Sequence, residues 1–217
     1  MEETPRHQCL IYDGSPAKML PALAAHIKQK LDENIRCLYL NSPTMVAGMR
    51  SYLFAAGVEV VYEVAKTSLI LTSDQSHVKN GRFDIDHMLR ILEETLNQAL
   101  SDGYRGLWAT GDMTWELGQD KNLDTLLEYE WRLERFFQKN PTMSGICQYH
   151  TDTLPRAAVC NGLLAHPALF INQTLACVNP NYLPSEARIQ PAAATADLQH
   201  IVYNLCAIQL GGDKEQL

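Results

Sequence analysis

Short apolar runs alternate along the chain with longer stretches in which apolar residues recur every three or four positions. The runs 7–12, 36–41 and 144–150 have the length and composition of buried strands. The first longer stretch predicts a helix with one apolar face, formed by Leu20, Leu23, Ala24, Ile27 and Leu31. Strands and helices in alternation predict an α/β fold, with a mostly parallel central sheet flanked by helices.

Residues that begin and end helices support this division. Ser15 followed by Pro16 predicts one helix start, and Asp84 predicts another. Gly57 predicts the end of a helix that begins near Thr44.

Three other kinds of segment complete the expected main domain. Val58–Glu63 and Ser68–Thr72 predict a third strand and a short fourth strand. The polar stretch 73–83 predicts a surface loop able to act as a lid. Later segments predict two helices and a terminal hairpin, at about 122–138, 154–165, 169–172 and 176–178.

The end of the chain is expected to be separate from this domain. The proline-containing stretch 179–191 predicts a linker, which divides the chain into a main domain, 1–190, and a C-terminal segment, 191–217. That segment predicts a C-terminal helix with one apolar stripe, formed by Leu198, Ile201, Leu205 and Ile208. It would serve as a connector or as the contact of a homodimer; the alternative is a last helix packed back on the domain.

The stretch 103–117 predicts the central strand of the sheet and the loop that follows it. A buried strand, Leu107–Thr110, is followed by a loop that carries Asp112, Met113 and Trp115. Ligands of parallel sheets bind at the carboxyl ends of strands. A carboxylate, a thioether and an indole at that place predict a mostly apolar pocket with one polar anchor. The alternative is a tight turn whose large side chains close the top of the core.

Composition and charge exclude several classes of protein. The net charge of −7 excludes a basic face for direct nucleic-acid binding. The sequence has no apolar run of the 18 or so residues needed to span a membrane, and Met1–Arg6 is too short for a secretory signal. The 6 cysteines form no C-x-x-C pair, which is typical of buried thiols in a reducing compartment. We therefore expect a cytoplasmic protein.

The turn after the first strand is where a nucleotide-binding fold would have its phosphate loop. Such a loop requires G-x-x-x-x-G-K followed by Ser or Thr. The segment Tyr12–Met19 has one glycine, a proline at Pro16 that removes an N–H group, and Met19 in place of the hydroxyl. No G-x-S-x-G elbow or paired carboxylates appear either. We expect no catalytic residues, although an ATPase with an unusual loop is an alternative.

Histidine and cysteine occur in two pairs that metals favour. His7 with Cys9, and Cys147 with His150, would supply ligands if their two strands were neighbours. His7 and Cys9 share a strand face, whereas the other two residues are three positions apart and point to opposite faces. We expect no metal and no cofactor, with a redox or metal sensor as a further alternative.

Seven motifs in order, across nearly all of residues 7–187, resemble one known family. They are H-x-C-L-x-Y from His7, G-R-F-D from Gly81, G-Y-x-G-L-x-x-T-G-D-M-T-W from Gly103, L-L-E-Y-E from Leu126, C-Q-Y from Cys147, H-P at His166, and N-P-N-Y-x-P from Asn179. This set resembles the MEDS domain, the methanogen and methylotroph sensory domain named after the dichloromethane-dehalogenase repressor.

The resemblance implies a RecA/KaiC-like fold that has lost its phosphate loop, and a sensor of simple hydrocarbon derivatives without catalytic activity. It also implies an output module, a transcription regulator or histidine kinase, as a partner. Trp108 departs from the arginine common in the family, which implies a more apolar ligand. The positions that match the family's characteristic residues, together with Met113, are the ligand-binding candidates: His7, Cys9, Tyr12, Asp112, Met113, Trp115, Glu130 and Tyr149.

The expected sheet sets how these candidates would meet. The carboxyl ends of its strands would bring Tyr12, the loop 112–115 and Tyr149 to one edge, with Glu130 approaching from the following helix. His7 and Tyr12 are separated by about 17 Å along one strand, so they are not expected to share a pocket. The predicted function is sensing of a small organic molecule.

Overall fold

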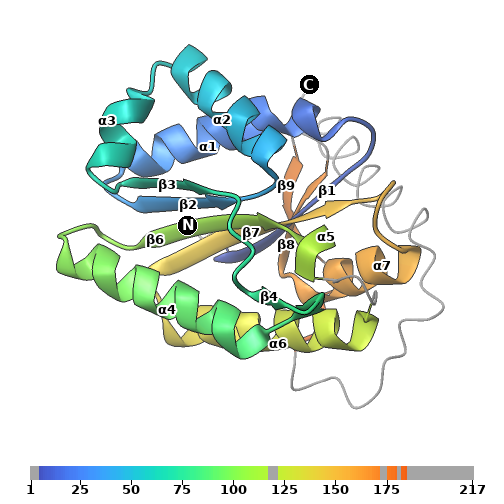
Figure 1. Ribbon diagram of the computed structural model, residues 1–217. Coiled ribbons are helices and arrows are strands. Elements are labelled where there is room, and N and C mark those ends of the chain that lie inside the picture. The colour runs from blue at the N-terminus through green and yellow to red at the C-terminus, as the bar shows by residue number, and fades with distance from the viewer. Residues whose placement is uncertain (1–4, 117–121, 172–174, 180–181, 185–217) are drawn as a thin grey trace, which may run out of the picture.

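A sheet of seven strands forms the middle layer of the protein (Figure 1). In the computed structural model, residues 5–116, 122–171, 175–179 and 182–184 are described. The strand order is β3-β2-β6-β7-β1-β8-β9; the first six strands are parallel and β9 is antiparallel to β8. The strands are β1 (His7–Tyr12), β2 (Arg36–Leu40), β3 (Leu69–Thr72), β6 (Leu107–Asp112), β7 (Met143–His150), β8 (Ala168–Ile171) and β9 (Leu175–Val178).

Helices cover both faces of this sheet, α1 to α3 on one side and α4, α6 and α7 on the other (Figure 1). Their bounds are η1 (Pro16–Met19), α1 (Leu20–Asp32), α2 (Pro43–Ala55), α3 (Val60–Ala65), α4 (Ile85–Ser101), α5 (Met113–Glu116), α6 (Leu123–Lys139) and α7 (Arg156–Ala165). The expected α/β fold with a mostly parallel sheet is confirmed. None of the described helices is both long and apolar enough to cross a bilayer.

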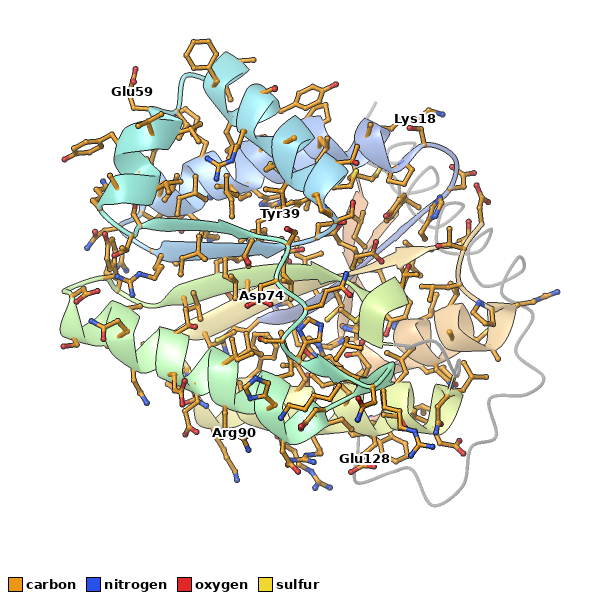
Figure 2. All side chains as sticks on the ribbon, in the orientation of Figure 1. Lys18, Tyr39, Glu59, Asp74, Arg90 and Glu128 are labelled. Carbon is orange, nitrogen blue, oxygen red and sulfur yellow. The ribbon has the colours of Figure 1, made fainter. Side chains whose placement is uncertain are left out.

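Alternation of side chains along the strands creates two cores. In β1, Cys9 and Ile11 belong to the core under α4, α6 and α7, whereas Leu10 and Tyr12 belong to the core under α1 and α2. Side chains fill both layers, while Arg90 and Glu128 project outward from α4 and α6 (Figure 2). The strands are buried on both faces, which explains why they were recognisable as continuous apolar runs.

The predicted helix boundaries largely agree with the structure. The Asp84 carboxylate accepts a hydrogen bond from the His87 amide at 2.9 Å and caps α4. Gly57 adopts a φ of +82° after α2, as a helix stop requires. Ser15 makes no side-chain capping bond, and the helix after it begins as the short 3₁₀ turn η1.

The expected strand Val58–Glu63 is wrong: this segment enters α3. Strand β2 pairs with β3 on one side and β6 on the other, so the segment cannot pair with β2. The segment also does not join β3, the edge strand of the described sheet, and packs as a helix instead, because β propensity depends strongly on context. Val60 is buried, whereas Val61 is 84% exposed, so the short helix contacts the domain through one face.

The stretch 73–83, expected to be a polar surface loop, contains a hairpin of β4 (Val78–Lys79) and β5 (Arg82–Phe83). Asn80 and Gly81 have φ of +53° and +74°, the left-handed pair of a tight two-residue hairpin turn. Phe83 is buried and packs edge-on against the Tyr129 ring at 4.8 Å between centroids. The hairpin is therefore anchored on α6 by apolar contact.

The terminal hairpin was predicted correctly and is formed by β8 and β9, one residue earlier than expected. Of the expected linker, Asn179 is buried and its side-chain amide donates to the carbonyl of His166 at 2.9 Å. The predicted C-terminal helix and its apolar stripe lie outside the described residues. The division at residue 190 stays a prediction.

The close approach of β6 to β7 predicts the effect of adding one methyl group. A Cβ on Gly145 would lie 2.4 Å from the Ala109 carbonyl oxygen, which belongs to backbone that the sheet holds in place. We expect Gly145→Ala to lower the free energy of unfolding by about 1–3 kcal/mol in urea denaturation. Gly48→Ala is the control, since its Cβ would meet only the flexible end of Leu20; a loss as large as that of Gly145→Ala would contradict this explanation.

Burial of His77 under the hairpin predicts a dependence of stability on pH. Burial lowers the pKa of His77 from 6.5 to about 4, with Asp74 opposing and His87 adding to the shift. The neutral ring is favoured in the folded state, so its stabilisation is complete above pH 6.5 and is lost as the pH falls toward 4. Between pH 6.5 and pH 4, we expect the free energy of unfolding to fall by up to about 3 kcal/mol less in His77→Gln than in the parent chain. Urea denaturation across this pH range measures the difference. Parallel pH profiles of variant and parent would contradict the assignment.

Candidate functional site

The sheet divides the predicted ligand-binding residues between its two faces. Five belong to the side covered by α4, α6 and α7: His7, Cys9, Met113, Glu130 and Tyr149. Tyr12 lies in the opposite core, and Asp112 acts electrostatically on it from the end of β6. Trp115 lies in the short helix α5, and its side chain is outside the described part of the structure. The candidates therefore do not form a single pocket.

A buried polar cluster occupies the α4/α6/α7 side. His7 Nδ1 lies 2.7 Å from Glu134 Oε2, and His7 Nε2 lies 3.4 Å from Glu130 Oε2. The Tyr149 hydroxyl donates to Glu130 Oε1, and His166 Nε2 lies 3.4 Å from Glu130 Oε2. Glu130 is only 1% exposed, so its carboxylate depends on these neighbours for solvation.

Protonation in this cluster follows from the balance between burial and neighbouring charges. Burial favours the neutral ring of His7, but Glu130 and Glu134 outweigh it and raise the His7 pKa. Burial works against ionised Glu130 too, but His166, His7 and Tyr149 lower its pKa. Burial dominates at His166 and lowers its pKa to about 4.

Two close contacts position the cluster. Strands β1 and β7 are neighbours in register, with Cys9 beside Cys147. On α7, a Cβ at Gly162 would lie 2.5 Å from the Tyr149 ring, so the helix can approach only because this residue is glycine. His166 follows α7 directly, and the close packing of α7 brings its ring to 4.0 Å from that of His7.

Of the two predicted metal-ligand pairs, the structure brings together one member of each. The Cys147 thiol lies 3.5 Å from His7 Nε2, while His150 points to the other face and stacks on Tyr12. Sequence reasoning missed Glu134 and His166. Glu130 and Glu134 are four residues apart and lie on the same face of α6 as its buried apolar residues. This spacing was a signal in the sequence that both carboxylates face inward.

A small apolar cavity lies beside this cluster, between the sheet and the inner faces of α4 and α6. We call it the α4/α6 cavity. Its volume is about 30 Å³, small compared with the ~150 Å³ cavity that accepts benzene in an engineered protein. Its lining is almost entirely apolar and includes Leu38, Leu40, Met88, Leu92, Ala109, Met113, Tyr129, Leu133, Phe137, Met143 and Cys147.

The turn between β1 and η1, where a phosphate loop would lie, is satisfied by the protein itself. The Gly14 amide donates to the Asp152 carboxylate at 2.9 Å, and His150 Nε2 donates to the Gly14 carbonyl at 2.7 Å. The Lys18 amide donates to the Ser15 carbonyl. The Gly14 amide, which would donate to a phosphate, thus already donates to the Asp152 carboxylate. The negative charge of that carboxylate would also repel an anion.

A comparison with known protein families identifies the family of the chain. Residues 6–167, more than half of the chain, match the family model of the MEDS domain, described as the methanogen/methylotroph, DcmR sensory domain. The matched segment runs from the start of β1 through the helix and histidine that complete the polar cluster. No curated protein matches the chain. The chain belongs to the MEDS family of sensory domains.

Proposed function

We propose that this sensory domain binds a small, weakly polar organic molecule in the α4/α6 cavity, as part of a signal-transduction or transcription-regulatory protein. The observation that carries the proposal is the cavity itself, which is apolar and lies between the sheet and two helices. Binding sites for small molecules are mostly apolar, with few polar groups. Here the Cys147 thiol, shared with the polar cluster, is one of the few polar groups in the lining.

The lining suits a ligand of a few heavy atoms. Three methionines, Met88, Met113 and Met143, contribute to it, and their unbranched side chains can adjust to different shapes. A molecule that buries about 150 Å² would gain about 4 kcal/mol from apolar burial, before the cost of association. The proposed sensor is therefore a weak binder that responds to abundant compounds.

A path from the cavity to the surface supports a role in signalling. Tyr129 lines the cavity and also packs against Phe83 of the β4–β5 hairpin. A ligand that binds one arrangement of these rings more tightly than another shifts the population toward that arrangement. In this proposal the hairpin passes the change to an output module or partner.

The proposed role is binding rather than catalysis. Burial, reinforced by Glu130, raises the pKa of the Cys9 thiol well above its usual value, and a protonated thiol is a poor nucleophile. Cys37 is likewise buried and its pKa is raised, chiefly by burial.

Filling the cavity should abolish ligand binding. We expect dichloromethane, and ethanol as a second probe, to shift the methyl NMR signals of Met88, Met113 and Met143 saturably in the parent chain. Enlarging the cavity by Leu133→Ala should in addition allow benzene to bind. Ala109→Leu places its larger side chain in the cavity and should remove the shifts of the methionine methyl signals. Ala55→Leu, the same change on the exposed surface of α2, should preserve these shifts. Shifts that persist in a folded Ala109→Leu variant would place the ligand elsewhere.

The satisfied turn after β1 predicts no nucleotide binding. We expect millimolar ATP with magnesium to leave the melting temperature unchanged, because a ligand stabilises only by binding the native state. Asp152→Asn, which removes the carboxylate charge near Gly14, tests whether repulsion alone prevents binding. A rise of several degrees in the parent chain that Lys18→Ala abolishes would restore the alternative of a nucleotide-binding protein.

A further inference from the structure

Four side chains with metal-binding atoms converge in the polar cluster from separate elements. They are His7 from β1, Glu130 from α6, Cys147 from β7 and His166 after α7, and their ligand atoms all lie within 4.8 Å of one another. None of the four residues is more than 5% exposed. Two imidazoles, a thiol and a carboxylate are the ligand types that Zn²⁺ takes in proteins.

Four of the six distances between these atoms lie close to the edges of a coordination tetrahedron, and all six are within 4.8 Å. With usual zinc bond lengths, two nitrogen or oxygen ligands lie about 3.3 Å apart, and a pair that includes sulfur lies about 3.5 Å apart. Glu130 Oε2 lies 3.4 Å from Nε2 of both His7 and His166. Cys147 Sγ lies 3.5 Å from His7 Nε2 and 3.8 Å from Glu130 Oε2.

Hydrogen bonds to groups other than these four residues orient three of the four ligands, His7, His166 and Glu130. His7 Nδ1 lies 2.7 Å from Glu134 Oε2, and His166 Nδ1 lies 2.6 Å from the Gly162 carbonyl oxygen. Both imidazoles can therefore donate outward through Nδ1 and present an Nε2 lone pair inward. Tyr149 donates to the other oxygen of Glu130. Such an outer layer of carboxylate, carbonyl and hydroxyl is typical of metal-ligating histidines and carboxylates.

His166 gives the strongest reason for a cation. A proton on Nδ1 satisfies the Gly162 carbonyl, and in the neutral ring Nε2 is then an acceptor that faces a second acceptor, Glu130 Oε2. Within the described residues, this buried Nε2 has no hydrogen-bond partner. Moving the proton to Nε2 would instead set a bare Nδ1 against the Gly162 oxygen. A positive ion between Nε2 and the carboxylate removes the conflict.

We propose that His7, Glu130, Cys147 and His166 bind one divalent transition-metal ion of the Zn²⁺ class. A thiolate and a carboxylate supply two negative charges, which neutralise the ion in a site sealed from water. Four protein ligands leave no open position, as in structural zinc sites. The ion would join β1, β7, α6 and the end of α7. This site departs from the expectation of no metal drawn from the sequence, and it does not depend on the proposed ligand in the cavity.

The test is metal content and affinity of the untagged full chain. We expect mass spectrometry to find about one zinc per chain, and the chelator-stripped protein to recover one Zn²⁺ in competition with a chromophoric chelator. Co²⁺ should give the charge-transfer absorption of a cobalt–thiolate bond. Cys147→Ala and His166→Ala should weaken Zn²⁺ binding at least 100-fold, and Cys147→Ala should lose the cobalt–thiolate absorption. Cys37→Ala, a buried cysteine in the opposite core, is the matched control and should keep both.

A second variant keeps the test decisive if the ligand variants do not fold. Glu134→Gln leaves all four ligands in place but weakens the acceptor of His7 Nδ1, and should reduce Zn²⁺ affinity roughly 10- to 100-fold. Zn²⁺ should raise the melting temperature of the parent more than that of this variant. A stripped parent chain that takes up no Zn²⁺ would overturn the proposal. So would a folded Cys147→Ala or Glu134→Gln variant that binds Zn²⁺ as tightly as the parent.

Discussion

A carboxylate buried on the inner face of α6 requires partners, and the packing under α4, α6 and α7 supplies them to Glu130. Leaving one partner of a buried charge unpaired costs about 3–5 kcal/mol, a large share of the stability of an ordinary domain. Tyr149 of β7, His7 of β1 and His166 after α7 all approach this one side chain. The positions of β1, β7, α6 and α7 relative to one another therefore depend on a single residue. Its side chain is almost fully buried, with only 1% exposed to solvent.

The two faces of the sheet have different chemistry because side chains alternate along each strand. Under α4, α6 and α7 an apolar cavity and a charged cluster share Cys147, so a molecule in the cavity would lie beside ionisable groups. On the opposite face Tyr12 stacks on His150, which also holds the turn after β1. A sensory role is easier to reconcile with the first face, since the second uses its polar groups to close the turn.

Sequence predicted the fold well where burial dictates composition. Strands β1, β2 and β7 are covered on both faces, so nearly every position is buried and most are apolar, and their runs are visible without knowledge of neighbouring strands. The segment 58–63 was misjudged because β propensity reports fit to a sheet surface, and this segment packs instead as a short helix that buries Val60. The hairpin around Asn80 and Gly81 was missed although that dipeptide is a strong hairpin signal. Of the candidate site, alternation could separate Tyr12 from Cys9, but only strand order brings His7 to Cys147. His166 was noted from the sequence only as part of the H-P motif, because its role depends on how closely α7 packs.

The place of β1 in the sheet has a consequence for how the chain acquires its structure. This first strand lies between β7 and β8, whose residues come more than 130 positions later in the sequence. During synthesis β1 has no partner until residues 143–171 have emerged, and pairing over so long a loop is slow. The apolar strand β1 therefore stays exposed to solvent during this time. The charged cluster, which includes His7, is completed only after β7 and β8 have been synthesised. Strands β2, β3 and β6 can pair earlier, but β1 joins the sheet only after β7 and β8 have been made.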